Sequence, residues 1–150
     1  MDLGFTGKVA MVAASSKGLG FGIAQELARE GASVSIASRT QTDIENAAAK
    51  LRDETGASVL ATVMDATSAD SIQNWVQRTF AEFGGVDALV VNAGGPPPGQ
   101  FDDFSDNDWQ NAFELNVMSG VRMIRGVLPL MRKRGGGSIL TVTSSSVKEP

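Results

Sequence analysis

Short apolar runs alternate with amphipathic stretches along the whole sequence. The apolar runs predict five buried strands, at Val9–Ala14, Val34–Ala37, Val59–Met64, Val86–Val91 and Ile139–Thr143. Their residues are apolar almost without interruption, which is typical of strands that are covered on both faces, as in a parallel sheet.

The segments between these runs carry apolar residues at helical spacing. Leu19, Ile23 and Leu27 recur every four residues and predict the buried stripe of a first helix, which should end at Gly31. Thr42 is expected to cap the second helix, because a side-chain oxygen at that position can accept a bond from a free backbone N–H group.

A third helix is expected from Ser68, and a fourth, much longer one from about Ser105 to Arg134. The main apolar stripe of this long helix comprises Trp109, Ala112, Phe113, Val117, Val121 and Ile124. Further apolar residues lie off that stripe, so more than one face of this helix should be buried against a neighbour.

Strands that alternate with helices at a spacing of roughly 30 residues predict βαβ units with right-handed crossovers. The expected fold is therefore α/β, a Rossmann-like doubly wound parallel sheet with the visible strand order 3-2-1-4-5. Folds of this type have further C-terminal strands, which are absent from the 150 residues. We expect residues 1–150 to form a single domain that is truncated at its C-terminal end.

Composition narrows the function classes. Apolar residues make up 42% and charged residues 20%, as in ordinary globular proteins, and there is no Cys, no His and no Tyr. These absences exclude disulfides, thiol catalysis and the usual zinc sites, so no metal site is predicted. A net charge of −4 without blocks of like charge argues against nucleic acid. No membrane span or signal peptide is recognisable, so we expect a cytoplasmic protein.

The segment between the first predicted strand and the first predicted helix is a candidate phosphate-binding loop. A helix that begins near Gly18 offers free N–H groups and the positive end of its dipole to a phosphate, and small residues let the backbone come close. The candidate cofactor-binding residues here are Ala14, Ser16, Lys17, Gly18, Leu19 and Gly20. The alternative is a tight strand-to-helix turn without a ligand. The spacing does not fit a P-loop.

Ser38 and Arg39 follow the second predicted strand, where dinucleotide-binding folds place the group that contacts the adenosine ribose. A guanidinium can hold a 2′-phosphate through two hydrogen bonds, and Lys17 adds a second cation nearby. No carboxylate is present at positions 37–39. This pattern favours NADP(H) over NAD(H) as the cofactor, and the alternative is an ordinary surface arginine.

Two further candidates follow the third and fourth predicted strands. Asp65, followed by Ala66, could accept the adenine amino group or cap the next helix. Asn92, Ala93 and Gly94 follow Val91, and their small size allows a flat ring system to lie against the backbone. The Asn92 amide can also tie neighbouring strand ends together by hydrogen bonds.

These motifs, in this order and spacing, resemble the N-terminal part of the short-chain dehydrogenase/reductase family, and the chain is similar to 3-oxoacyl-acyl-carrier-protein reductases within it. The glycine loop of the family, Thr-Gly-x-x-x-Gly-x-Gly, corresponds to Ala13–Gly20, and Asn-Asn-Ala-Gly to Val91–Gly94. The resemblance further implies that Asn116 is the relay asparagine and that Ser144 is the serine that orients the substrate oxygen. The alternative for Asn116 is a polar residue that bridges the backbone of a helix and a strand. The alternative for Ser144 is an ordinary hydroxyl in a strand end that is rich in Ser and Thr.

The resemblance implies hydride transfer between NADP(H) and a ketone, of the 3-oxoacyl type, or a secondary alcohol. The Tyr-x-x-x-Lys pair of the family would fall beyond Pro150, so we expect the 150-residue chain alone to be inactive. A second hypothesis is a dinucleotide-binding or interaction module without catalysis, because Tyr is missing and Ala13 and Ala14 replace the usual Thr and Gly. The expected partners are a small carbonyl or alcohol substrate and further copies of the chain, in a homodimer or homotetramer.

Overall fold

The computed structural model describes residues 3–95 and 97–145 of the chain. Five strands form one sheet in the order β3-β2-β1-β4-β5, with every neighbouring pair parallel. The strands are β1 (Val9–Ala13), β2 (Ser33–Ser38), β3 (Val59–Val63), β4 (Ala88–Val91) and β5 (Ser138–Thr141). This arrangement confirms the predicted Rossmann-like sheet and its strand order.

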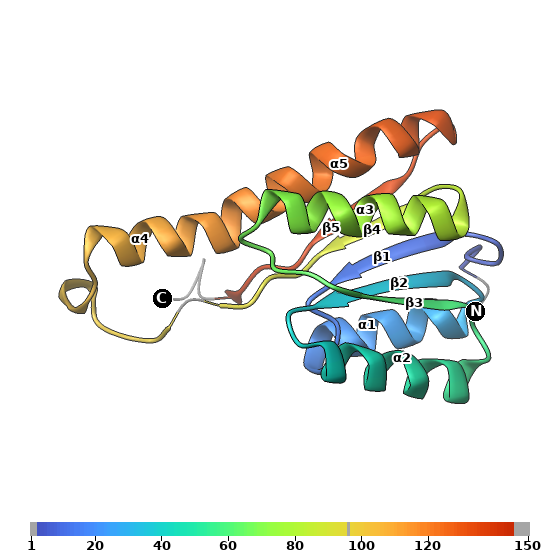
Figure 1. Ribbon diagram of the computed structural model, residues 1–150, viewed down its shortest axis with the longest axis horizontal. Coiled ribbons are helices and arrows are strands. Elements are labelled where there is room, and N and C mark those ends of the chain that lie inside the picture. The colour runs from blue at the N-terminus through green and yellow to red at the C-terminus, as the bar shows by residue number, and fades with distance from the viewer. Residues whose placement is uncertain (1–2, 96, 146–150) are drawn as a thin grey trace.

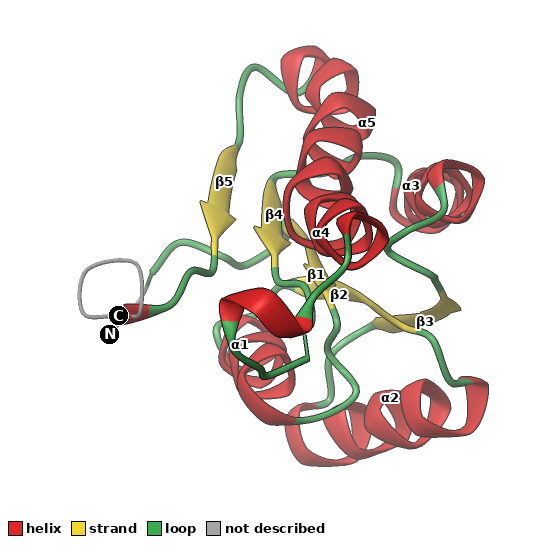
Figure 2. Ribbon diagram, turned by 90° about the vertical axis from the view of Figure 1, so that its left-hand side faces the viewer, coloured by secondary structure: helices red, strands yellow, loops and turns green. Residues whose placement is uncertain are grey.

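Helices cover both faces of the sheet (Figure 1). On one face lie α1 (Gly18–Arg29) and α2 (Gln41–Thr55), and on the other lie α3 (Ala69–Phe83) and α5 (Ser119–Lys133). The crossovers β1-α1-β2 and β3-α3-β4 therefore use opposite faces, which is what a doubly wound sheet requires. Figure 2 shows the two helical layers end on, with β5 at the outer edge of the sheet.

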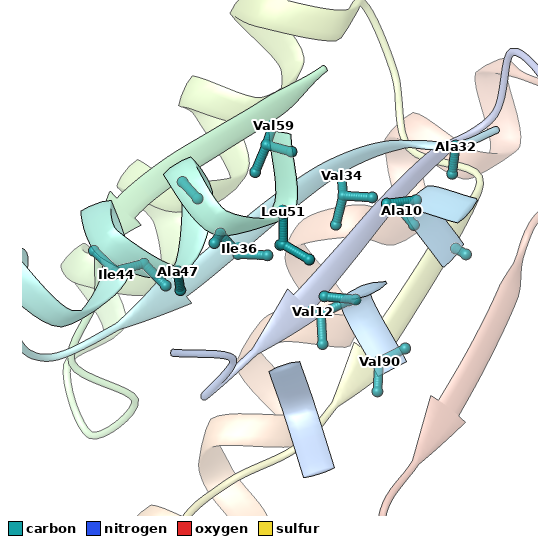
Figure 3. Close-up of a cluster of buried hydrophobic side chains, with 14 residues drawn as sticks. Ala10, Val12, Ala32, Val34, Ile36, Ile44, Ala47, Leu51, Val59 and Val90 are labelled. Atoms are coloured by element: carbon teal, nitrogen blue, oxygen red, sulfur yellow. The ribbon is translucent and has the colours of Figure 1, made fainter. Parts of the chain in front are cut away.

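Each face of the sheet has its own apolar core. Between the sheet and α1 and α2, Val12 and Ile36 from the strands pack near Leu51 of α2, and all three are fully buried (Figure 3). On the opposite face, Trp75 of α3 and Met123 of α5 are fully buried with the residues of the other strand face. Double coverage accounts for the continuous apolar character of β1 and β4, whose residues are all buried, whereas the four residues of β5 are exposed in spite of its apolar run.

The Trp75 side of the core also contains a satisfied polar cluster. The indole Nε1 of Trp75 donates to Ser35 Oγ at 2.9 Å, Ser35 Oγ lies 2.7 Å from Thr79 Oγ1, and Thr79 Oγ1 donates to the Trp75 carbonyl at 2.9 Å. Buried polar groups are tolerated where they find partners in this way. By contrast, Thr62 Oγ1 of β3 is buried without a hydrogen-bond partner in the described part of the chain.

Two predicted details of the first two helices are wrong. The fully buried line of α1 consists of Gly20, Ala24 and Ala28, because small residues let the helix approach the sheet closely. Ile23 and Leu27 of the predicted stripe are partly buried and pack against this core, but Leu19 is 63% exposed. The second helix begins two residues earlier than expected: its N-cap is Thr40 instead of Thr42, and the Thr40 side chain makes no capping bond. The predicted cap of α3 is confirmed, since Ser68 Oγ accepts a bond from the Ser71 N–H group at 3.2 Å.

The long helix from Ser105 is present but differs from its prediction in two ways. It consists of α4 (Asp106–Phe113), a π-helical turn η2 (Glu114–Met118) and α5. The face that packs against the sheet carries Met123, Val127 and Met131, whereas the predicted main stripe is largely exposed. Figure 1 shows why: α4 continues the line of α5 past the carboxyl ends of the strands, so no sheet lies beneath it.

Candidate active site

A cleft of about 470 Å³ lies at the carboxyl ends of the strands. β1 pairs with β2 on one side and with β4 on the other, so the direction of winding reverses next to β1. Ligands of doubly wound folds bind at this switch point. The cleft is lined by Ala14, Ser16, Lys17, Ser38, Arg39, Thr40, Asp43, Met64, Asp65, Ala66, Thr67, Ala93, Gly94, Gly95 and Leu115.

The loop after β1 combines strain with an open helix end. Ala14 has a φ of +47°, the left-handed region in which a Cβ is unfavourable, and this explains why the family pattern has Gly there. Lys17, the N-cap of α1, makes no side-chain capping bond, and the first turn contains no acidic residue. Gly18 has a φ of +61° and open space where a Cβ would lie. The amino end of α1 is therefore suited to receive an anion.

Behind this loop, Gly20 and Asn92 form a close contact between α1 and the end of β4. A Cβ on Gly20 would lie 2.7 Å from Asn92 Nδ2 and closer still to the Ala14 carbonyl oxygen. Asn92 Nδ2 donates to the carbonyl oxygens of Ala13 and Ala14, at 3.3 Å each. The expected role of Asn92 in tying strand ends together is thus confirmed.

Sequence reasoning missed Ser15, a fully buried member of the same loop. Its Oγ donates to the Val12 carbonyl at 2.7 Å and accepts a bond from the Ala37 N–H group at 3.2 Å. These bonds fix the exit of β1 against the exit of β2, which holds the two basic residues of the cleft in place. The only sequence signal was a small polar residue directly after an apolar strand.

Two cations lie on the wall formed by the ends of β1 and β2. Lys17 and Arg39 both line the cleft and are both exposed, and Ser38 lies beside them. In the described part of the chain, neither cation makes an ion pair within 4.0 Å. Both charges therefore remain accessible to a ligand.

The turn after β3 contributes a further part of the lining. Asp65 Oδ1 accepts bonds from the Thr67 N–H group at 2.9 Å and from Thr67 Oγ1 at 2.8 Å. These hydrogen bonds, from the backbone and then the side chain of Thr67, lower the pKa of Asp65, and the charge of Arg39 contributes in the same direction. Asp65 is thus ionised at neutral pH. It closes the turn that precedes α3, whose cap is Ser68.

The two predicted catalytic residues lie outside the lining of this cleft. Asn116 is exposed on η2, directly after the lining residue Leu115, and its Nδ2 donates to the Ala112 carbonyl at 2.8 Å. This places Asn116 on a π-helical turn, a distortion that is frequent at functional sites. Ser144 is exposed three residues beyond the end of β5.

Among the predicted cofactor-binding residues, the structure brings Ala14, Ser16, Lys17, Ser38, Arg39, Asp65, Ala66, Ala93 and Gly94 together in the cleft. Gly18, Leu19, Gly20 and Asn92 do not line it. The prediction overlooked Asp43, Thr40 and Leu115, since their positions within helices or turns gave no signal that they would face a ligand. No group of three or more metal-ligating side chains is found in the residues that were described, and none of their helices is long and apolar enough to cross a membrane.

Comparison with known proteins shows which family the chain is similar to. A family model described as short chain dehydrogenase matches residues 8–150. The chain is 39% identical over 144 residues to dehydrogenase/reductase SDR family member 4 of Homo sapiens, an alignment that covers 95% of this chain and 51% of that protein.

Solved structures show the same likeness. L-Sorbose reductase from Gluconobacter frateurii, complexed with NADPH and L-sorbose, superposes with a TM-score of 0.96 at 37% identity, over 100% of this chain and 57% of that one. A 7α-hydroxysteroid dehydrogenase complexed with NADH and a 7-oxo bile acid gives 0.92 at 33% identity, over 98% and 57%.

The chain belongs to the short-chain dehydrogenase family. It spans about half the length of the curated relatives that it matches.

Proposed function

We propose that the chain is the cofactor-binding half of an NADP(H)-dependent oxidoreductase that interconverts a ketone and a secondary alcohol. The observation that carries the proposal is the cleft at the switch point, where Lys17 and Arg39 stand beside the uncapped amino end of α1. L-Sorbose reductase, which is complexed with NADPH and L-sorbose, supports NADP(H) as the cofactor. The 7α-hydroxysteroid dehydrogenase, complexed with NADH and 7-oxo glycochenodeoxycholic acid, supports only a nicotinamide cofactor and a carbonyl substrate.

The described residues fit such a cofactor. The first turn of α1 would hold the pyrophosphate, since the N–H groups there point outward and Gly18 leaves room for close approach. Lys17 and Arg39 would hold the 2′-phosphate, with Ser38 beside it. Asp65 and Ala66 would contact the adenine, and Ala93 and Gly94 would lie along the ring systems farther on.

The bound nicotinamide would supply or accept the hydride. Ser144 would orient the substrate oxygen, and Asn116 would hold a water in a proton relay, as the family resemblance implies. Asn116 has its amide nitrogen committed to the Ala112 carbonyl, which leaves its amide oxygen for such a water. A 3-oxoacyl substrate remains a prediction from the overall likeness of the sequence.

The proposal extends to partners and location. The exposed aromatic side chains of Trp109 and Phe113 on α4 support a homodimer or homotetramer, since large exposed apolar patches mark protein interfaces. The cytoplasm remains the expected compartment.

The direct test is a fluorescence titration of the 150-residue chain with NADPH and NADH. Replacing Arg39 with Gln removes a charge-assisted contact to the 2′-phosphate, about 1.5–3 kcal/mol, so the Kd for NADPH should rise about 10- to 100-fold. The Kd for NADH should stay nearly unchanged. Turnover of carbonyl substrates by this chain should be negligible, because it contains no Tyr to donate the proton.

Arg78→Gln is the matched control. Arg78 is exposed on α3, away from the lining of the cleft, and the substitution changes the net charge equally. If both variants weaken NADPH to the same extent, Arg39 acts only through the overall charge of the protein. If the unaltered chain does not bind NADPH at all, the proposal is wrong.

A further inference from the structure

The cleft contains a carboxylate that the sequence around Arg39 did not reveal. Asp43 lies in the first turn of α2 and lines the cleft together with Lys17 and Arg39. It also lines a second hollow, of about 460 Å³, between α1 and α2, which shares Ser16 and Lys17 with the first. Asp43 therefore stands where the two hollows meet, on the side of the basic residues.

The geometry of α2 directs this carboxylate toward the phosphate end of the cleft. The Cα–Cβ bonds of a helix tilt toward its amino end, so the side chain of Asp43 leans back toward Thr40 and Arg39. Asp43 is exposed, so its carboxylate is in contact with solvent at the edge of the cleft.

Within the described residues, the charge of Asp43 is not compensated by a partner. It makes no ion pair within 4.0 Å, and no capping bond is made at the N-cap of α2. Asp65, the other carboxylate of the cleft, differs because two hydrogen bonds from Thr67 already stabilise its charge. The lining residues thus carry two cations and two carboxylates. Asp43, the carboxylate without such donors, lines both hollows together with Lys17.

We propose that Asp43 is a specificity-determining residue that limits the preference of this cleft for NADPH over NADH. The inference rests on the proposed function, because it concerns the same cofactor. A 2′-phosphate bound by Lys17 and Arg39 would lie close enough to Asp43 for repulsion, whereas a free 2′-hydroxyl would not be repelled. Asp43 therefore weakens NADPH binding selectively and lets NADH compete.

The test measures the Kd values of NADPH and NADH for the 150-residue chain and for Asp43→Asn at low ionic strength. Removing the charge of Asp43 should tighten NADPH binding about fivefold, which is the order of magnitude of a Coulomb interaction between nearby charges in water. NADH binding should change less than about twofold. In 0.5 M salt, where the Debye length is about 4 Å, most of the gain should disappear.

Asp53→Asn is the control, because Asp53 is exposed on the same helix but outside both hollows. The inference is overturned if the two variants behave alike, if Asp43→Asn tightens NADPH and NADH equally, or if the gain survives high salt. In each of these cases the proposed function still stands, provided that the unaltered chain binds NADPH. If the unaltered chain binds neither cofactor, the proposed function fails, and the inference fails with it.

Discussion

The contact between Gly20 and the end of β4 allows a sharp test of how the cleft is held together. In Gly20→Ala, the new methyl group would lie 2.7 Å from Asn92 Nδ2 and even closer to the Ala14 carbonyl oxygen. The backbone at Ala14 cannot move away freely, since its φ of +47° is already unfavourable. The Asn92 side chain would have to shift and give up its two hydrogen bonds to the loop.

The expected cost combines two effects. Overpacking a close contact costs about 1–3 kcal/mol, and losing two long hydrogen bonds adds about 1 kcal/mol. We therefore expect the free energy of unfolding to fall by about 2–4 kcal/mol. With a urea m-value of about 2 kcal/mol/M, the unfolding midpoint should fall by more than about 1 M.

Gly22→Ala is the matched control in the same helix. Nothing lies within 4 Å of a Cβ at Gly22, so alanine there should stabilise the helix by about 0.5–1 kcal/mol. Urea unfolding of both variants, followed by circular dichroism, measures the difference. If Gly20→Ala is as stable as Gly22→Ala, the close contact between α1, the loop and β4 does not exist as described.

Two further variants test the interior and the turn after β3. Thr62→Val should raise the free energy of unfolding by about 1 kcal/mol, because it removes a buried hydroxyl that has no partner among the described residues. Thr79→Val should lower the free energy of unfolding, because the Thr79 hydroxyl is hydrogen-bonded to Ser35. Equal effects of the two variants on urea unfolding would contradict this. The pKa of Asp65 is lower in the folded chain, so its stabilisation is complete above its unfolded pKa of about 4 and is lost as the pH falls through the folded value. The difference in melting temperature between the unaltered chain and Asp65→Asn should therefore shrink in acid, and a difference that is constant with pH would refute the hydrogen-bonded turn.

The strands were predicted correctly from their local apolar pattern, even in β5, whose four residues are all exposed. Continuous apolar runs identified all five strands, and the spacing between them predicted the doubly wound order. The long helix shows the limit of this reasoning. It carries apolar residues on two faces, and periodicity alone cannot determine which one meets the sheet, because that depends on where the sheet ends.

Among the site residues, too, sequence reasoning identified some and missed others. Ser16 and Arg39 were predicted correctly as cleft residues, because each follows a strand and all parallel strands end at one edge of the sheet. Asp43 was missed because it enters the cleft from a helix, whose start was placed at Thr42 instead of after Thr40. Two residues correspond to more than half a turn of a helix, so an error of this size in the predicted start leaves the direction of a first-turn side chain undetermined.

The outer strand β5 has a consequence for the behaviour of the chain in solution. Its four residues are all exposed, and in the described sheet only β4 pairs with it. Its other side is not paired with any described strand, and Ile139 and Leu140 are exposed on it, so β5 can serve as a template for another strand. Any segment that docks there would extend the sheet, and in a concentrated sample the nearest available segment is the same edge of a second molecule.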